Sequence, residues 1–405
     1  MKQKTQYKQT PIGLIPQDWE VKTLTEIGKV VTGNTPSRKD LTLWNGDFCW
    51  VTAKDFKEKY IYDSIEKITE RGCKNARILP KGAVLITCIA SIGNNAIAAV
   101  PLATNQQINS IIVSNDTSNE WLYYQLDFFK QNLGLLASKT AVPLVNKSDF
   151  EKLQIPLPPL PEQQKIAEIL SNWDKAIQEV QLLIKKLEVR NKALAFSLLT
   201  GKKRVKGFEG KWEIKNFGKI ISRVTKKNEE LNDTVVTISA KRGFILQEDF
   251  FNKRVASDTL SGYYLLKKGQ FAYNKSYSNG YPMGVFKRLN DFDKAVVTTL
   301  YICFELKENI CSDFMVHYFD SGLMNNNLMK IAKEGGRAHG LLNIGIEDFM
   351  NLKITMPSLE EQTAIAAILN TAQQELKQYQ EKLKALQQQK KGLMQQLLTG
   401  KIRTI

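Results

Sequence analysis

Basic and amide side chains stand close together in several loops of this sequence. Lysine and arginine suit phosphate oxygens and the acceptors on a guanine edge, whereas asparagine and glutamine suit an adenine edge. The chain carries 57 Lys and Arg against 41 Asp and Glu, a formal charge of +16. Such an excess creates a positive field that attracts polyanions. Many surface lysines serve only to keep a protein in solution. The charge therefore favours a nucleic-acid partner, and the rest of the sequence has to distinguish the two interpretations.

Twelve loop residues are candidates for contact with nucleic acid. In the first half they follow the segment WVTA, occupy the SIGNN turn and lie in SKTAV, and the second half has a counterpart for each place. The candidates are Lys54, Lys57, Asn94, Asn95, Lys139, Thr140, Lys241, Arg242, Lys275, Asn279, Arg337 and His339. Each is also open to a plainer interpretation as a solvated charge or a turn former. Arg337 is the best single case, because the two glycines before it let backbone approach phosphate while the arginine reaches a base.

The sequence lacks the motifs that carry catalysis on nucleic acids. Its one Pro-Pro pair, Pro158-Pro159, is not in the Asp/Asn-Pro-Pro-aromatic loop of an adenine methyltransferase, and no Gly-Lys pair is followed by Ser or Thr as in a Walker A loop. The E-x-K matches at 20–22 and 213–215 are too short to indicate a nuclease. His317 and His339 have no partners for a triad or metal site. We therefore expect neither a catalytic nor a metal site, and no cofactor bound by this chain.

Cysteine usage and the N-terminus indicate a reducing compartment. The five cysteines are scattered and form neither a disulfide framework nor a zinc pattern. The basic N-terminal segment has no apolar stretch typical of a signal peptide. The most apolar window, GAVLITCIASIGNNAIAAVPLA, has Gly93, Asn94 and Asn95 at its middle and is typical of two short buried strands around a turn, not of a membrane span. We expect a cytoplasmic protein.

An internal repeat organises the whole chain. Residues 149–204 match residues 348–403 at a constant offset of 199, with 23 identities in 56 pairs, where chance gives about one in fifteen to twenty. The repeat includes LPPLPEQQKIAEIL from Leu157 and MPSLEEQTAIAAIL from Met356. A repeat this long indicates duplication of a domain and not a solenoid.

Each copy of the repeat predicts a long helix with an apolar seam. The seam residues alternate at spacings of three and four, and both seams are interrupted at the same position, by Asn191 in the first copy and Lys390 in the second. They are Ile166, Leu170, Trp173, Ile177, Val180, Ile184, Leu187, Leu194 and Leu198, and Ile365, Leu369, Ala372, Leu376, Tyr379, Leu383, Leu386, Leu393 and Leu397. One polar seam residue tends to fix the register between two packed helices. Two separate amphipathic helices, each covering its own domain, remain the alternative.

The helix ends carry matching signals. Pro161 suits a first helical turn, Ser358 with Glu361 forms a capping box, and both helices stop at LLTGK, where Gly201 and Gly400 suit a left-handed cap. The seam from Ile166 to Leu198 is about 50 Å long at 1.5 Å per residue. Such helices are typical of a spacer.

The segments outside the helices predict two related globular domains. Trp19 and Trp212 begin similar segments, and LPKGAVLIT from Leu79 resembles LKKGQFAYN from Leu266. Alternating stretches such as SIIVSN and LYICFEL predict strands, while NEWLYYQLDFFKQNLG and SDFMVHYFDSGLMNNNLMKIA predict helices packed on them. Short linkers make the long helices antiparallel, with a domain at each end and a pseudo-two-fold axis. The fold class is α+β, divided into a first domain (1–155), a first helix (156–201), a second domain (202–354) and a second helix (355–405).

With these motifs the chain resembles the DNA-specificity subunits of Type I restriction-modification systems, over essentially its whole length. The proline-flanked PEQQKIAEIL start, the LLTGK end and the duplication occur together, although Glu360 stands in the second copy where the first has Pro161. The resemblance implies two target recognition domains, each reading half of a bipartite, asymmetric DNA target, and two helices that set the spacing. It also implies a noncatalytic subunit that directs adenine methylation and restriction. A self-sufficient enzyme and a coiled-coil adaptor without DNA are the competing hypotheses.

The resemblance further implies partners. Two methyltransferase subunits, and restriction or translocase subunits where present, join such a chain on double-stranded DNA, and S-adenosylmethionine, ATP and magnesium belong to those partners. Because the helix start is repeated, we expect two equivalent docking surfaces at exposed first turns. Their residues are Glu162, Gln163, Glu361 and Gln362.

Overall fold

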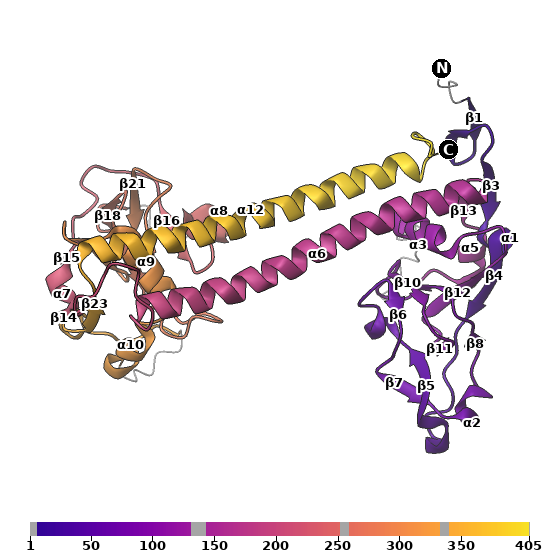
Figure 1. Cartoon of the computed structure of the whole chain (residues 1–405), viewed down its shortest axis with the longest axis horizontal. Helices are drawn as coiled ribbons and strands as arrows, with labels where there is room; N and C mark the ends of the chain where they lie inside the picture. The colour runs from indigo at the N-terminus through magenta and orange to yellow at the C-terminus, as the bar shows by residue number, and fades with distance from the viewer. Residues whose placement is uncertain (1–5, 131–142, 252–258, 333–339, 405) are drawn as a thin grey trace. The chain divides into compact units, whose positions relative to one another are not determined.

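The computed structural model describes residues 6–130, 143–251, 259–332 and 340–404 (Figure 1). It divides into two compact units, unit 1 from residues 1–181 with 381–405 and unit 2 from residues 182–380. Each unit holds one globular domain and parts of two long helices, α6 (Leu160–Leu199) and α12 (Leu359–Leu397). Among the described residues, none of the helices is long and apolar enough to span a bilayer.

The domain of unit 1 is built from short strands and a few short helices. Its strands are β1 (Tyr7–Thr10), β2 (Gly13–Pro16), β3 (Glu20–Thr23), β4 (Gly28–Thr32), β5 (Trp44–Val51), β6 (Tyr60–Ile61), β7 (Glu66–Ile68), β8 (Ile78–Leu79), β9 (Val84–Thr87), β10 (Asn95–Ala98), β11 (Leu102–Thr104), β12 (Ile108–Val113) and β13 (Gln154–Leu157). Its helices are α1 (Leu24–Ile27), η1 (Leu41–Leu43), η2 (Ala53–Asp55), α2 (Glu70–Cys73), α3 (Asn119–Phe128) and α5 (Lys147–Glu151). The strands form sheets of order β4-β12-β9-β10-β6 and β7-β5-β11-β8, with the separate pairs β1-β2 and β13-β3.

The domain of unit 2 has a simpler set of sheets. Its strands are β14 (Glu213–Asn216), β15 (Ile221–Arg223), β16 (Val236–Ser239), β17 (Gly243–Leu246), β18 (Tyr264–Lys267), β19 (Phe271–Asn274), β20 (Val285–Arg288), β21 (Lys294–Val297), β22 (Ile302–Leu306) and β23 (Lys353–Met356). Its helices are α7 (Phe217–Ile220), α8 (Gln247–Phe251), α9 (Ser312–Asp320), α10 (Asn325–Ile331) and α11 (Ile346–Met350). The largest sheet has the order β15-β22-β19-β20, beside the pairs β14-β23, β16-β17 and β18-β21.

The two domains share one framework. The order β4-β12-β9-β10 in unit 1 matches β15-β22-β19-β20 in unit 2, and the pair β13-β3 matches β14-β23, with the strands in the same sequence order. In each domain the outer pair joins the strand that directly follows a tryptophan, β3 after Trp19 or β14 after Trp212, to the strand that leads into a long helix. The prediction that the domains are divergent copies is therefore confirmed, and what differs lies outside this framework.

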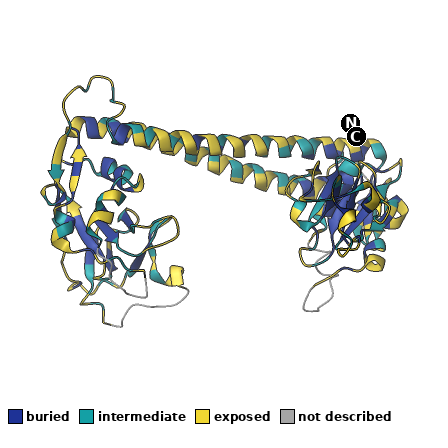
Figure 2. Ribbon diagram, turned by 90° about the horizontal axis from the view of Figure 1, so that it is seen from below, coloured by how far each residue is buried: buried dark blue, intermediate teal, exposed yellow. Residues whose placement is uncertain are grey.

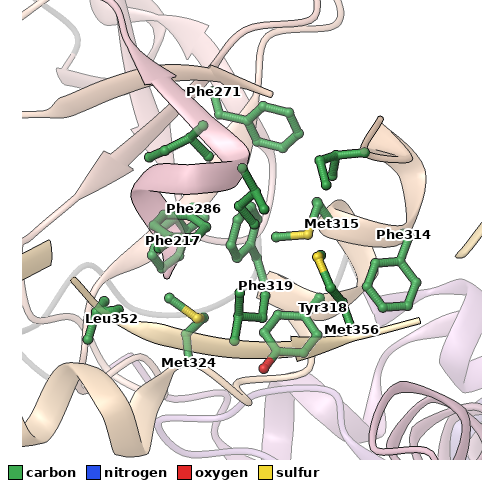
Figure 3. Close-up of a cluster of buried hydrophobic side chains, with 14 of the residues drawn as sticks. Phe217, Phe271, Phe286, Phe314, Met315, Tyr318, Phe319, Met324, Leu352 and Met356 are labelled. Atoms are coloured by element: carbon green, nitrogen blue, oxygen red, sulfur yellow. The ribbon is translucent and has the colours of Figure 1, made fainter. Parts of the chain in front are cut away.

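Each domain packs its core against the long helices. In unit 2 the core holds a cluster of aromatic rings that includes Phe217, Phe286 and Phe319 (Figure 3). The same cluster continues onto Leu198 of α6 and Ile365 of α12. In unit 1 the corresponding core carries tryptophans and tyrosine beside the apolar residues of both helices. It includes Trp19, Trp121, Tyr124, Phe150, Ile166, Leu170, Leu397 and Leu398. Since both helices enter each core, neither domain is complete without them.

Within each unit the two helices run antiparallel along the predicted seam. The start of α6 packs against the end of α12 in unit 1, and the end of α6 packs against the start of α12 in unit 2. Figure 2 shows buried and exposed residues alternating along both helices, as a one-sided seam requires. The amide of Asn191 donates to the carbonyl of Ala372 at 2.8 Å, and Lys390 pairs with Asp174 at 2.5 Å. Both polar seam residues therefore contact the opposite helix, which explains why a polar residue stands there.

The predicted ends of the elements also agree with the structure. Gly201 and Gly400 both have φ of +70°, the left-handed conformation expected after a helix. The apolar window GAVLITCIASIGNNAIAAVPLA forms β9 and β10 around a turn. The segment from Ser312 is the exception, because the turn at Gly322, with φ of +76°, divides it into α9 and α10.

A tight contact between the two sheets of unit 1 gives a stability test. Gly33 is buried directly after β4, and a Cβ built there meets Thr104 Oγ1 at 2.2 Å and the Asn105 carbonyl oxygen at 2.3 Å. Gly33→Ala is expected to lower the free energy of unfolding by roughly 1–3 kcal/mol, because backbone must move to admit the methyl group. Gly210→Ala is the control, since no atom lies within 4 Å of its added Cβ. Equal urea midpoints for the two variants would contradict the expectation.

Candidate nucleic-acid interface

The first turn of α6 holds a buried carboxylate. The Glu162 side chain has no exposed surface, and a carboxylate in that position must be neutralised and hydrogen-bonded. The indole N–H of Trp19 donates to it at 2.8 Å, and Arg403 donates two hydrogen bonds, each of 2.8 Å. Arg403 also binds Asp18 through two nitrogens, at 2.9 and 2.6 Å. We name these four residues the unit 1 clamp.

The first turn of α12 repeats this arrangement. Glu361 accepts two hydrogen bonds of 2.6 Å from Arg204 and one of 3.2 Å from the indole of Trp212. These three residues are the unit 2 clamp. Among the described residues Arg204 has a single carboxylate partner, because Lys211 precedes Trp212 where Asp18 precedes Trp19. In both clamps the carboxylate hydrogen bonds raise the pKa of the arginine.

The glutamine beside each glutamate ties the helix start to a second helix. Gln163 accepts from the backbone N–H of Ser118, which caps α3, at 2.8 Å, and Gln362 accepts from the N–H of Cys311, which caps α9, at 3.0 Å. Each glutamine also donates to the proline carbonyl five residues before it. The repeated Glu-Gln pair thus anchors a helix start to its own domain.

These contacts correct the sequence-based interpretation of the four helix-start residues. Glu162, Gln163, Glu361 and Gln362 are at most 2% exposed, so the expectation that they offer exposed docking surfaces is wrong. Their polar atoms are occupied by partners from within the same unit. The capping box at Ser358 forms only in part, because Glu361 turns away from it to Arg204.

A groove of about 590 Å³ lies in unit 1 where the domain meets α6. It brings together the candidates Lys57, Asn94 and Asn95. Lys57 is exposed, Asn94 accepts from Lys130 Nζ at 2.7 Å, and Asn95 donates to the Tyr123 carbonyl at 2.5 Å. The groove also holds lysines that the sequence did not single out, since the sheet order assembles them from distant segments. They are Lys59, Lys130 and, on α6, Lys175.

Unit 2 has a groove of about 280 Å³ at the joint of its domain with α12. The candidates Lys241 and Arg242 reach it from the exposed turn of the β16-β17 hairpin. Lys287 and Arg288 of β20 are further cations in this groove, which the sequence analysis missed. Both are held by carboxylates of α9, Lys287 by Asp320 and Arg288 by Asp313, each at 2.7 Å.

The two grooves occupy matching places in their units. Asp174 in the first groove and Gln373 in the second stand at the same position of the 199-residue repeat. Asp127 and Asp320, which also line the grooves, each lie nine residues after the residue that caps α3 or α9. The residues facing these shared positions differ in type and spacing, so the two grooves present different chemistry in one frame.

The other candidates are scattered or undescribed. Lys54 is exposed on η2 but does not line the groove, and Asn279 is exposed in the loop after β19. Lys275 is half-buried beside that strand, where burial and the nearby Arg223 lower its pKa. Lys139, Thr140, Arg337 and His339 lie outside the described residues. Contact of any of the twelve candidates with nucleic acid stays a prediction.

Comparison with known proteins identifies the family. The model of the Type I restriction modification DNA specificity domain matches residues 16–189 and again residues 206–388. The chain belongs to this family. Each matched segment runs from a domain into the long helix that follows it, whereas the predicted division at residues 155, 201 and 354 stays a prediction.

Specificity subunits are similar to the chain in sequence. The MjaIX subunit of Methanocaldococcus jannaschii is 41% identical over 43% of this chain and 42% of its own length. The putative MjaX subunit of that organism is 29% identical over 98% of this chain and 96% of its own length. The EcoR124I/EcoR124II subunit of Escherichia coli is 27% identical over 47% of this chain and 50% of its own length. The chain thus matches half or less of the MjaIX and EcoR124I/EcoR124II subunits.

Solved structures support the same fold. The HsdS subunit from Thermoanaerobacter tengcongensis has a TM-score of 0.54 at 17% identity, covering 96% of this chain and 98% of that chain. The S subunit of the Type I restriction-modification system from M. genitalium has a TM-score of 0.53 at 16% identity, covering 94% and 96%. The predicted family and the fold of two mixed α/β recognition domains with long antiparallel helices are therefore confirmed. The family match and the specificity subunits among the relatives also confirm the prediction that this chain is a specificity subunit and not itself the enzyme.

The two clamps provide matched variants. Arg403→Met leaves Glu162 buried without its cation, at a cost on the order of 3 kcal/mol. We expect faster amide hydrogen exchange in the first turns of α6 and unchanged exchange at the start of α12. Arg204→Met is expected to give the reverse pattern, with a smaller effect because Arg204 is more exposed than Arg403. If both variants perturbed both helix starts equally, the clamps would not be independent.

Proposed function

We propose that the chain is the noncatalytic DNA sequence-recognition subunit of a Type I restriction-modification complex. Each domain reads one half of a bipartite, asymmetric target in double-stranded DNA. The complex thereby directs adenine methylation and restriction to that sequence, in the cytoplasm and without a membrane partner. Membership of the specificity family and the formal charge of +16 support this function.

The observation that carries the proposal is the pair of matching grooves with unlike linings. Lys57 with two asparagines lines one groove, and Lys241 with Arg242 lines the other. Sequence is read by side chains at base edges, so different linings on one frame suit two different half-sites. A chain built for uniform phosphate binding would not need two chemistries.

We further propose that α6 and α12 set the spacing between the half-sites. A gap of roughly one helical turn, about 10 bp between half-site centres, suits two domains that read the same face of DNA. The polar seam residues Asn191 and Lys390 would keep this spacing constant, because each of them fixes the helix register in its own unit.

The catalytic partners are part of the same proposal. Two methyltransferase subunits bind the chain, and restriction or translocase subunits join where the system contains them. S-adenosylmethionine, ATP and magnesium then belong to those partners. The similarity of the chain to specificity subunits of Type I restriction enzymes supports this assignment.

A different surface replaces the helix starts as the docking candidate. Leu182, Val189 and Phe196 of α6 are 54%, 72% and 46% exposed and repeat every seven residues. Exposed lysines 185, 186 and 192 lie beside them. A partner helix with an apolar seam and acidic flanks would complement this stripe. The corresponding residues of α12 are Glu381, Gln388 and Gln395, so the second partner would need other contacts.

The stripe can be tested on the chain with its methyltransferase partner. Val189→Glu places a charge where an apolar contact is expected. The interface then loses roughly 1.5–3 kcal/mol of binding free energy that burial of the valine side chain would supply, which predicts at least tenfold weaker binding of one partner copy. Gln388→Glu, at the matching position of α12, is the control and should bind normally. Titration calorimetry measures both. Equal affinities for the two variants would remove the stripe from the interface.

DNA recognition is tested in the second groove. For the double variant Lys241→Gln and Arg242→Gln, we expect weaker binding of the target. The logarithm of the binding constant should also depend less steeply on the logarithm of the salt concentration, with a slope smaller by about 1 for each phosphate that the variant no longer neutralises. Where a side chain reads a base, one position of one half-site should instead lose about 1–3 kcal/mol of discrimination. Fluorescence anisotropy over a salt series measures both quantities, with Lys307→Gln as the control. Unchanged affinity, slope and discrimination would contradict a DNA-binding role for this groove.

A further inference from the structure

Lys390 connects α12 to more than the opposite helix. Its ammonium lies 2.5 Å from one oxygen of Asp174 on α6, and the other oxygen of Asp174 accepts a 2.6 Å hydrogen bond from the hydroxyl of Tyr124. Tyr124 belongs to α3 of the domain and its ring is fully buried. Two consecutive contacts therefore link a seam residue of one helix, through the second helix, to the domain of unit 1.

The Tyr124 end of this link is firmly held. Lys59, from the loop before β6, donates to the tyrosine hydroxyl at 3.1 Å and to Ser171 of α6 at 2.9 Å, and it also pairs with Glu120 of α3. Burial raises the pKa of Tyr124, so the hydroxyl keeps its proton and donates to the carboxylate. Since Asp174 and Lys59 both line the groove of unit 1, a change in this network alters the wall of the groove.

Unit 2 has a different arrangement at the corresponding positions. Asn191 has the matching seam position, but its amide donates to the backbone carbonyl of Ala372. The position of Asp174 is taken by Gln373. His317, which matches Tyr124, instead bonds Asn370 of α12 at 2.7 Å. In unit 2 the seam contact and the domain contact are therefore separate.

We propose that Lys390 is a positioning residue for DNA recognition by unit 1. By holding Asp174, and through it Tyr124, it fixes the orientation of the unit 1 groove on the helix pair. Reading by unit 1 then depends on the register of the two helices, whereas reading by unit 2 does not depend on Asn191 in this way. The inference rests on the proposed DNA-recognition function.

The test uses the full chain with its methyltransferase partner, after the target has been mapped by the adenines it methylates. Lys57→Gln assigns the half-site that unit 1 reads. Competition binding then compares the target with duplexes that carry base changes in either half-site or a gap altered by about 1 bp. For Lys390→Met we expect about tenfold less discrimination at the unit 1 half-site, greater tolerance of the altered gap, and unchanged discrimination at the other half-site.

Three further variants separate positioning from charge and from general stability. Tyr124→Phe breaks the same link with no change of charge, so it should reproduce the effect of Lys390→Met and carries the test if that variant does not fold. Lys390→Arg should retain discrimination. Asn191→Ala removes a seam contact that reaches no groove, so it should leave base discrimination at both half-sites at the wild-type level and affect only the tolerance of the gap. A silent Tyr124→Phe, or an equal loss at both half-sites, would overturn the inference. A wild-type complex that failed to discriminate any target would instead overturn the proposed function.

Discussion

A buried carboxylate at the start of each long helix is the constraint on which the two units depend. Glu162 and Glu361 have nearly no exposed surface, and neither helix start supplies the cation that such a group requires. The cation comes from the residues just past the end of the other helix, Arg403 in one case and Arg204 in the other. The same glutamates accept hydrogen bonds from the indoles of Trp19, directly before β3, and of Trp212, directly before β14. Each glutamate thus holds the two long helices together and also attaches the domain to them.

The internal repeat allowed the fold to be predicted, because helix periodicity, caps and strand alternation are local properties of the sequence. The seams and the glycine caps followed from the repeat, and residue alternation predicted some of the strands, such as β12 and β22. The clamps were not predicted, although a signal was present. Arg204 and Arg403 are identical residues at equivalent positions of the repeat, and so are the two glutamates. Acidic residues in the first turn of a helix are commonly exposed, however, and the sequence therefore favoured a partner protein as their contact. Only the antiparallel packing within each unit shows that these pairs meet.

The sequence predicted some of the residue types that line the grooves, but not where the grooves lie in the fold. Lys57 and the asparagine pair were recognised as loop residues able to contact nucleic acid, but Lys59, Lys130 and Lys175 join them only through the order of the strands and the position of α6. Asn95 illustrates the limit of residue type as a guide, because its amide holds the Tyr123 carbonyl. Four of the twelve candidates fall outside the described residues.

The discontinuity of unit 1 bears on how the protein is made. Unit 2 is one continuous stretch of chain, whereas unit 1 needs residues 381–405 to complete a core whose first part ends at residue 181. A ribosome therefore finishes the sequence of unit 2 first, even though the domain of unit 1 emerges before it. Until the end of α12 is released, Glu162 has no arginine, and the apolar start of α6 is covered by its own domain alone. The domain synthesised first is therefore the one whose core is completed last.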